Sequence, residues 1–151
     1  MDIVQQVLCG KVNKHLVSII NNLGGKAIGL CGLDGALFQA KKLDEKYGLV
    51  GRITGVNPEP VENALLSGYI PVVSTVAQGV DADTAYNINA DTAAAELAIS
   101  LGAENISFST LPSEWRSPYI YLDREEVLTL VNTYLNPYVE DRTMEDLNIP
   151  A

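Results

Sequence analysis

The chain has 151 residues, of which 47% are hydrophobic and 19% are charged, so it can bury the core of one globular domain. Its formal charge of −9 argues against a protein that binds nucleic acid through the phosphate backbone. The sequence has no apolar run long enough to span a bilayer and no signal peptide at its start. We therefore expect a cytoplasmic protein that makes no contact with a membrane.

Two cysteines, Cys9 and Cys31, and a single histidine, His15, are the chain's soft metal ligands. A zinc site needs more such ligands at closer spacing, so no metal site is predicted. Both cysteines stand among apolar residues. They are predicted to be reduced, largely buried thiols that fill the core.

Residues 3–23 are predicted to form an amphipathic helix, because apolar residues recur every four positions. These residues are Val4, Leu8, Val12, Leu16 and Ile20. The pair Gly24-Gly25 then ends the helix, as glycine commonly does.

Three strands are predicted in the next part of the chain. "KAIGLCG" (26–32) has the apolar run of a buried strand, and Asp34-Gly35 is typical of a hairpin turn into "ALFQAKKL" (36–43). "GLVGRITGV" (48–56) is the third strand.

The second half alternates between helix and strand. A short helix runs from Pro58 to Gly68, and "YIPVVSTV" (69–76) is a central strand. Residues Asp81 to Thr84 form the tip of a second hairpin, between "STVAQGV" and "AYNI". The helix "ADTAAAELAISLG" (90–102) and the strand "ENISFST" (104–110) follow.

This order predicts an α/β fold with parallel central strands. Segments 26–32, 69–76 and 104–110 should be neighbours in one mainly parallel sheet. Residues 1–110 are expected to form the main domain. Residues 111–151 are expected to be a divergent C-terminal segment with one or two helices, one of them at 123–135.

Three polar residues alternate at the start of the alanine-rich helix: Asn87, Asn89 and Asp91. Helix capping explains part of this pattern, because Asn89 suits an N-cap and Asp91 favours the positive end of a helix. A ligand pocket is the other explanation. In an extended segment Asn87 and Asn89 point to the same side, which would then be polar because it faces a ligand.

Four stretches in order resemble the middle of the acetylglutamate kinases, a group within the amino acid kinase family. They are "GKVNK" (10–14), "IGLCGLDGALFQAKKL" (28–43), "GLVGRITGVNPEPVENALLSGYIPVVSTVAQG" (48–79) and "YNINADTAAAELAISLGAE" (86–104). The resemblance covers roughly residues 1–110, and the ordered series carries it rather than any one motif.

The resemblance implies a three-layer α/β/α sandwich. It also implies transfer of the ATP γ-phosphoryl group, with Mg²⁺, to the side-chain carboxylate of N-acetyl-L-glutamate or a related acyl amino acid, in arginine biosynthesis. In that family the first asparagine of the N-x-N-A-D stretch, here Asn87, binds the acyl amino acid. The aspartate, here Asp91, orients the catalytic lysines. A homo-oligomer is a further possibility.

The sequence departs from the family at both ends. The family's glycine-rich phosphate-binding turns have no counterpart before Met1, and Gly24-Gly25 follows a helix rather than opening one. The residues after Thr110 are too few for a nucleotide-binding lobe. We therefore expect a truncated kinase fold that is inactive alone. The alternative is a non-catalytic binding or assembly module on the same scaffold, with helix 3–23 facing a partner.

Overall fold

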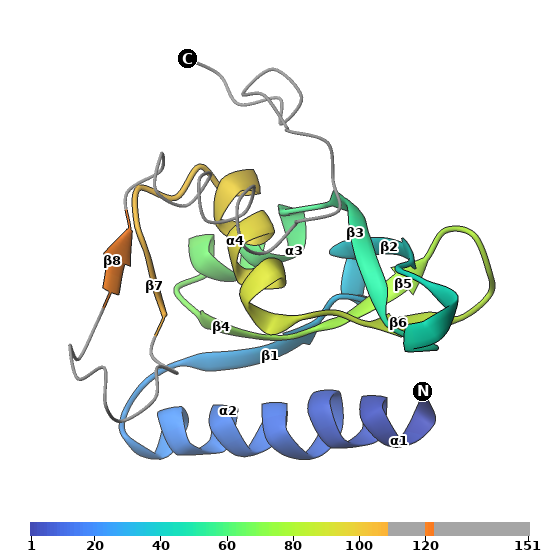
Figure 1. Ribbon diagram of the computed structural model, residues 1–151. Coiled ribbons are helices and arrows are strands. Elements are labelled where there is room, and N and C mark those ends of the chain that lie inside the picture. The colour runs from blue at the N-terminus through green and yellow to red at the C-terminus, as the bar shows by residue number, and fades with distance from the viewer. Residues whose placement is uncertain (109–119, 123–151) are drawn as a thin grey trace. The chain divides into compact units, whose positions relative to one another are not determined.

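The computed structural model of the chain describes residues 1–108 and 120–122 (Figure 1). The chain forms two compact units, Met1–Ala90 and Asp91–Ala151, which are described separately below. The predicted helix at 123–135 lies outside the described residues. The predicted domain boundary at residue 110 stays a prediction.

The N-terminal segment is one long helix, as predicted. It consists of α1 (Asp2–Gln5), a π-helical segment η1 (Gln6–Val12) and α2 (Asn13–Asn22), and Gly24 follows its end in a left-handed conformation. The periodic apolar residues do not form its buried face, because the one buried residue of the helix is the polar Asn13. The apolar pattern predicted the helix correctly but not the side that packs.

The first sheet is a parallel pair made of β1 (Ala27–Cys31) and β4 (Ile70–Ser74). Ala27 pairs with Ile70 at one end, and Cys31 pairs with Ser74 at the other. Figure 1 shows the long helix on one side of this pair and α3 (Glu59–Leu66) on the other. The predicted parallel pairing of segments 26–32 and 69–76 is confirmed.

The second sheet has four strands in the order β3-β2-β5-β6. Their bounds are β2, Phe38–Lys42; β3, Gly51–Val56; β5, Val76–Gly79; and β6, Ala85–Asn87. Strand β2 pairs antiparallel with β3, around the short 3₁₀ turn Glu45–Tyr47, and parallel with β5. Strands β5 and β6 form the second predicted hairpin, which is confirmed.

The predicted hairpin at Asp34-Gly35 is wrong, because β1 pairs with β4 and not with β2. Residues Asp34–Ala36 form a 3₁₀ turn instead. The Asp34 carboxylate accepts a 2.7 Å hydrogen bond from the Cys31 N–H at the end of β1. This turn directs the chain out of the first sheet and into the second.

The prediction of one single, mainly parallel sheet also needs correction. The strands of the first unit form two sheets, and in the second unit β7 (Ile106–Phe108) pairs antiparallel with β8 (Ile120–Leu122). The predicted place of segment 104–110 beside the other two segments stays a prediction. Three of the five strand pairings among the described residues are antiparallel. Antiparallel strands need only a short connecting turn, whereas each parallel pair needs a long crossover.

The core of the first unit lies around the second sheet, and its largest fully buried side chains come from four positions. They are Leu37, Phe38, Val61 and Val76. The prediction of largely buried cysteines holds only in part, since Cys9 and Cys31 are each half-buried. Partial burial is the main cause that raises the pKa of the Cys31 thiol to about 11.

Candidate functional site

Asn87 is the last residue of β6 and is held by its backbone. It pairs with Val76 of β5, and its N–H donates to the Leu49 carbonyl over 2.9 Å. The residues on either side, Tyr86 and Ile88, are buried, whereas Asn87 is half-exposed. Its side-chain amide has no hydrogen bond within the described part of the chain. The amide is therefore available to a ligand.

The position of Asn87 is fixed next to the end of β4. The Ile88 N–H donates to the Thr75 carbonyl over 2.9 Å, and Thr75 directly follows the last residue of β4. The carboxyl ends of parallel strands are where open α/β folds bind ligands. Asn87 thus lies beside a strand end of the kind that binds ligands in such folds.

Asp91 lies in the first turn of α4 (Ala90–Ser100), in the second unit. It is exposed, and its carboxylate accepts no hydrogen bond from the described residues. The carboxylate therefore does not cap α4 by a hydrogen bond among the described residues, and its predicted interaction with the positive end of the helix stays a prediction. Asn89 is also exposed, and its predicted capping role stays a prediction. The hypothesis that Asn87 and Asp91 belong to one ligand pocket also stays a prediction.

Binding of ATP and Mg²⁺, which the family resemblance implies, is not assigned to any of the described residues. None of them form a group of three or more His, Cys, Asp or Glu side chains that could hold a metal ion. Gly24 and Gly68 have left-handed conformations after the ends of α2 and α3, so they do not open a helix towards a phosphate. Lys14 and Lys26 donate to backbone carbonyls, of Gly29 and Ser67.

Asn13 is the residue that sequence reasoning missed. It is 3% exposed, and its Nδ2 donates to the Leu30 carbonyl of β1 over 3.1 Å and to the Val72 carbonyl of β4 over 2.8 Å. Its Oδ1 is buried without a hydrogen-bond partner among the described residues. The stretch "GKVNK" therefore joins the long helix to both strands of the parallel pair. The sequence did contain a signal for this role, because Asn13 is a polar residue one helical turn from Cys9 and from Val17.

One shallow hollow opens on the first turns of the long helix. Its lining residues are Asp2, Gln5, Gln6, Cys9 and Gly10. None of the predicted site residues belongs to it, and we assign it no function.

Comparison with known proteins identifies the family. Residues 1–111 match the model of the amino acid kinase family. This chain belongs to the amino acid kinase family. Among its relatives, the acetylglutamate kinase of Clostridium beijerinckii is 50% identical over 135 residues, which are 88% of this chain and 46% of that protein. The acetylglutamate kinase of Halothermothrix orenii is 49% identical over 136 residues, 86% of this chain and 47% of its own.

A solved structure supports the same assignment at lower identity. The crystal structure of smu.665 from Streptococcus mutans UA159 is 28% identical, with a TM-score of 0.63, and the match covers 69% of this amino acid kinase family chain and 42% of that one. The chain spans less than half the length of the relatives described above. None of the helices in the described residues has the length and apolar character needed to cross a membrane.

Proposed function

We propose that this chain forms the central, acyl-amino-acid-binding part of an acetylglutamate kinase with the three-layer α/β/α fold of its family. Two relatives named acetylglutamate kinase share about half of the aligned residues with it. The observation that carries the proposal concerns Asn87: its side-chain amide has no hydrogen bond among the described residues, and its backbone lies beside the end of β4.

The chemistry of an asparagine amide suits N-acetyl-L-glutamate. Its N–H₂ group donates to a carboxylate or acyl oxygen of the ligand, and its oxygen accepts from the ligand's amide N–H. The ligand is an anion and the chain carries a formal charge of −9. A neutral amide therefore recognises the ligand without adding a like charge to the site.

Asp91 has the complementary role in this proposal. Its exposed carboxylate, which no described group occupies, holds lysine ammonium groups supplied from beyond the described residues. Charge-assisted hydrogen bonds fix the position of such ammonium groups. In the family, ATP with Mg²⁺ supplies the phosphoryl group. The chain spans less than half the length of these relatives, so alone it is expected to have no detectable kinase activity.

A chimera tests this function. Residues 1–110 of this chain replace the matching region of the Clostridium beijerinckii acetylglutamate kinase, and ATP-dependent phosphorylation of N-acetyl-L-glutamate is measured. We expect activity in the chimera and none in the chain alone. Asp91→Asn in the chimera should lower kcat by about 100-fold or more, because positioned electrostatic groups supply effects of that size. A folded but inactive chimera would contradict the proposal, as would a fully active Asp91→Asn variant.

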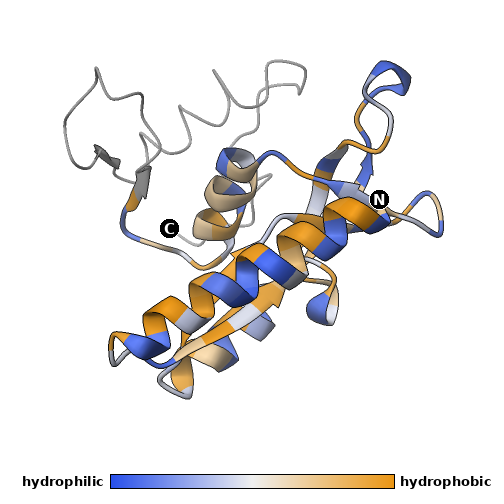
Figure 2. Cartoon of the chain, turned by 90° about the horizontal axis from the view of Figure 1, so that it is seen from below, coloured by the Kyte–Doolittle hydropathy of each residue, from blue (hydrophilic) through white to orange (hydrophobic). Residues whose placement is uncertain are grey.

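A second candidate function, a non-catalytic assembly module, is favoured by the surface of the long helix. Several large apolar side chains on it are exposed, and Figure 2 shows the apolar positions along it. They are Ile3, Val4, Val7, Val12, Leu16, Ile19 and Leu23. Such a surface commonly marks a protein contact. Sedimentation of the pure chain, with and without Leu16→Gln, shows whether this surface drives association; a monomer in both cases rules the candidate out.

A further inference from the structure

The long helix lies along β1 and runs in the opposite direction, as Figure 1 shows. Two of its side chains fix the alignment between them. Near the end of the helix, Asn21 Oδ1 accepts a hydrogen bond from the Ala27 N–H at the start of β1 over 2.7 Å. About two turns earlier in the helix, Asn13 Nδ2 donates to the Leu30 carbonyl over 3.1 Å. Positions nearer the start of the helix therefore lie nearer the end of β1.

This alignment brings the two cysteines of the chain to the same place. Cys9 stands four positions before Asn13, so it shares that side of the helix. Cys31 follows Leu30 and is the last residue of β1. The segment η1, which contains Cys9, contacts β1. Partial burial is the main cause of the raised pKa of Cys31, and Cys9 acts in the same direction, as only a nearby group can.

The helix also comes close enough to β1 for a covalent link. A Cβ atom at Gly29, two positions before Cys31, would collide with the Asn13 side chain. From Asn13 to Cys9 the helix advances by about 6 Å, and from Gly29 to Cys31 the strand advances by about 6.6 Å. Because the two advances match, Cys9 stands over Cys31 as Asn13 stands over Gly29. A disulfide requires this kind of close and facing pair.

The two thiols differ in their access from solution. Cys9 lines the shallow hollow on the first turns of the long helix, whereas Cys31 does not. A small reagent that enters the hollow therefore meets Cys9 first. The raised pKa keeps Cys31 protonated at neutral pH, and a protonated thiol is a weaker nucleophile than a thiolate.

We propose that Cys9 and Cys31 form a reversible disulfide, with a low-molecular-weight disulfide such as glutathione disulfide as the oxidant. The Cys9 thiolate attacks one sulfur of the oxidant, so a mixed disulfide forms and one glutathione thiolate leaves. Cys31 then gives its proton to solvent and attacks the Cys9 Sγ, and the second glutathione thiolate leaves. The chain loses two protons and two electrons, and one glutathione disulfide becomes two glutathione thiols.

The disulfide anchors a part of the helix that the reduced chain, with both thiols free, holds less firmly. Within the described part of the chain, the side chains that hydrogen-bond from the long helix to β1 are Asn13, Lys14 and Asn21, and none of them belongs to η1. Oxidation therefore gives η1 a covalent attachment to the sheet. The inference does not depend on binding of N-acetyl-L-glutamate.

Oxidation of the full chain by glutathione disulfide tests the proposal. Peptide mapping by mass spectrometry without reductant should find Cys9 linked to Cys31 in one chain, and dithiothreitol should remove the link. The folded structure holds the two thiols together, so the equilibrium constant for oxidation should be at least about tenfold larger in the folded chain than in urea. Equal constants in the two states, or disulfides between chains instead, would overturn the proposal.

Single substitutions test the order of the two steps. Cys31→Ser should stop at the mixed disulfide on Cys9, whereas Cys9→Ser should react with glutathione disulfide at least about tenfold more slowly. If either variant fails to fold, brief labelling of the natural chain with N-ethylmaleimide gives the same information, because Cys9 should be modified first. Faster modification of Cys31 than of Cys9 would contradict the proposed order.

Amide exchange measured by NMR tests the effect on the helix. The Gly10 N–H should exchange at least about tenfold more slowly in the oxidised chain than in the reduced chain, because the disulfide holds η1 on β1. Cys31→Ser treated with the same oxidant is the matched control and should show no such change. Unchanged exchange at Gly10 in the oxidised natural chain would show that the disulfide does not anchor the helix.

Discussion

The side-chain oxygen of Asn13 occupies the space that a Cβ atom at Gly29 would need. Asn13 is held in this place by its two hydrogen bonds to carbonyls of β1 and β4. The glycine in β1 therefore has a specific cause: it lets the long helix come close enough for one amide to bridge both parallel strands.

Gly29→Ala should destabilise the first unit by about 1–3 kcal/mol, because the added methyl group must displace Asn13 or the helix. Urea unfolding followed by circular dichroism measures the change. Gly10→Ala is the matched control, since a Cβ at that helix position meets no atom within 4 Å. This variant should gain about 0.5–1 kcal/mol through better helix propensity. Equal effects of the two changes would contradict the assigned role of Asn13.

Ala36 has a φ of 54°, a left-handed conformation that costs a residue with a Cβ atom. Ala36→Gly should stabilise the chain by up to about 1 kcal/mol, because glycine adopts this backbone without strain. The neighbouring Gly35 has a φ of 60°, and a Cβ there would come within 2.8 Å of Pro60. Gly35→Ala should therefore destabilise. Thermal unfolding of both variants tests the pair, and a loss of stability in Ala36→Gly would show that the turn is not strained.

Local sequence patterns predicted the helices and strands more reliably than they predicted which strands pair with each other. The long helix, α3 and the β5–β6 hairpin follow from apolar period, Pro58 and turn residues, all of which act within a few residues. The Asp34-Gly35 turn has the composition of a hairpin, yet the Asp34 carboxylate binds the Cys31 N–H and separates the flanking strands. Strand pairing depends on which distant edge offers a partner, and local composition does not contain that information.

Partial burial raises the pKa of Cys31 from 9.0 to about 11, with the nearby Asp34 carboxylate acting in the same direction. The folded chain keeps this proton to higher pH than the unfolded chain does. The contribution to stability is therefore complete below pH 9 and is lost as the pH rises towards 11. We expect Cys31→Ala to lose stability less steeply than the natural chain over this range, measured by urea unfolding. Parallel curves for the two proteins would show that Cys31 has an ordinary pKa.

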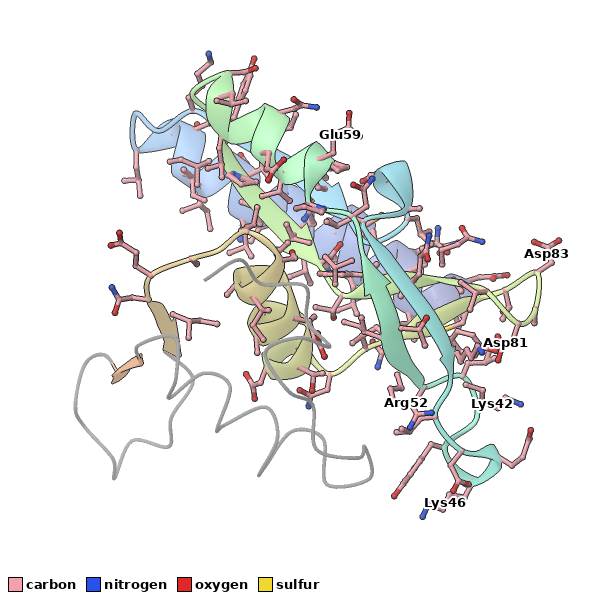
Figure 3. The ribbon with its side chains drawn as sticks, turned by 90° about the horizontal axis from the view of Figure 1, so that it is seen from above. Lys42, Lys46, Arg52, Glu59, Asp81 and Asp83 are labelled. Carbon is pink, nitrogen blue, oxygen red and sulfur yellow. The ribbon has the colours of Figure 1, made fainter. Side chains whose placement is uncertain are left out.

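Asp81 connects the β5–β6 turn to β2 through Lys42. Figure 3 shows the two residues close to each other. Partial desolvation of this exposed side chain raises the pKa of its carboxyl. Hydrogen bonds from the Lys42 N–H at 3.2 Å and the Tyr86 hydroxyl at 3.0 Å outweigh this effect, so the pKa is lowered from 3.8. The stabilisation is present above pH 3.8 and is lost as the pH falls through the lower, folded value.

Asp81→Asn should therefore reduce the free energy of unfolding near neutral pH and have little effect well below pH 3.8. Asp83→Asn is the control, because Asp83 lies exposed at the tip of the same turn (Figure 3). This control should change stability little at either pH. Equal losses from both substitutions would mean that the hydrogen bonds of Asp81 do not stabilise the hairpin.

The candidate site was only partly predictable. The alternation of Asn87, Asn89 and Asp91 suggested a polar side to the strand end, and Asn87 indeed has a free side-chain amide among the described residues. Sequence alone could not show that the Asp91 carboxylate accepts no hydrogen bond from the described residues, because capping and exposure both suit an aspartate there. The bridging Asn13 was missed because its partners lie 17 and 59 residues away.

The most direct test of the account is binding of N-acetyl-L-glutamate, measured by calorimetry on the chimera with Asn87→Ala or Asn89→Ala. Loss of the ligand's hydrogen bonds in Asn87→Ala should weaken binding by at least about tenfold with stability nearly unchanged. Asn89→Ala should keep the affinity, but it should lower the free energy of unfolding by about 1 kcal/mol, because α4 loses its N-cap. Unchanged affinity in Asn87→Ala, or identical behaviour of the two variants, would contradict the assignment of Asn87 to the acyl amino acid.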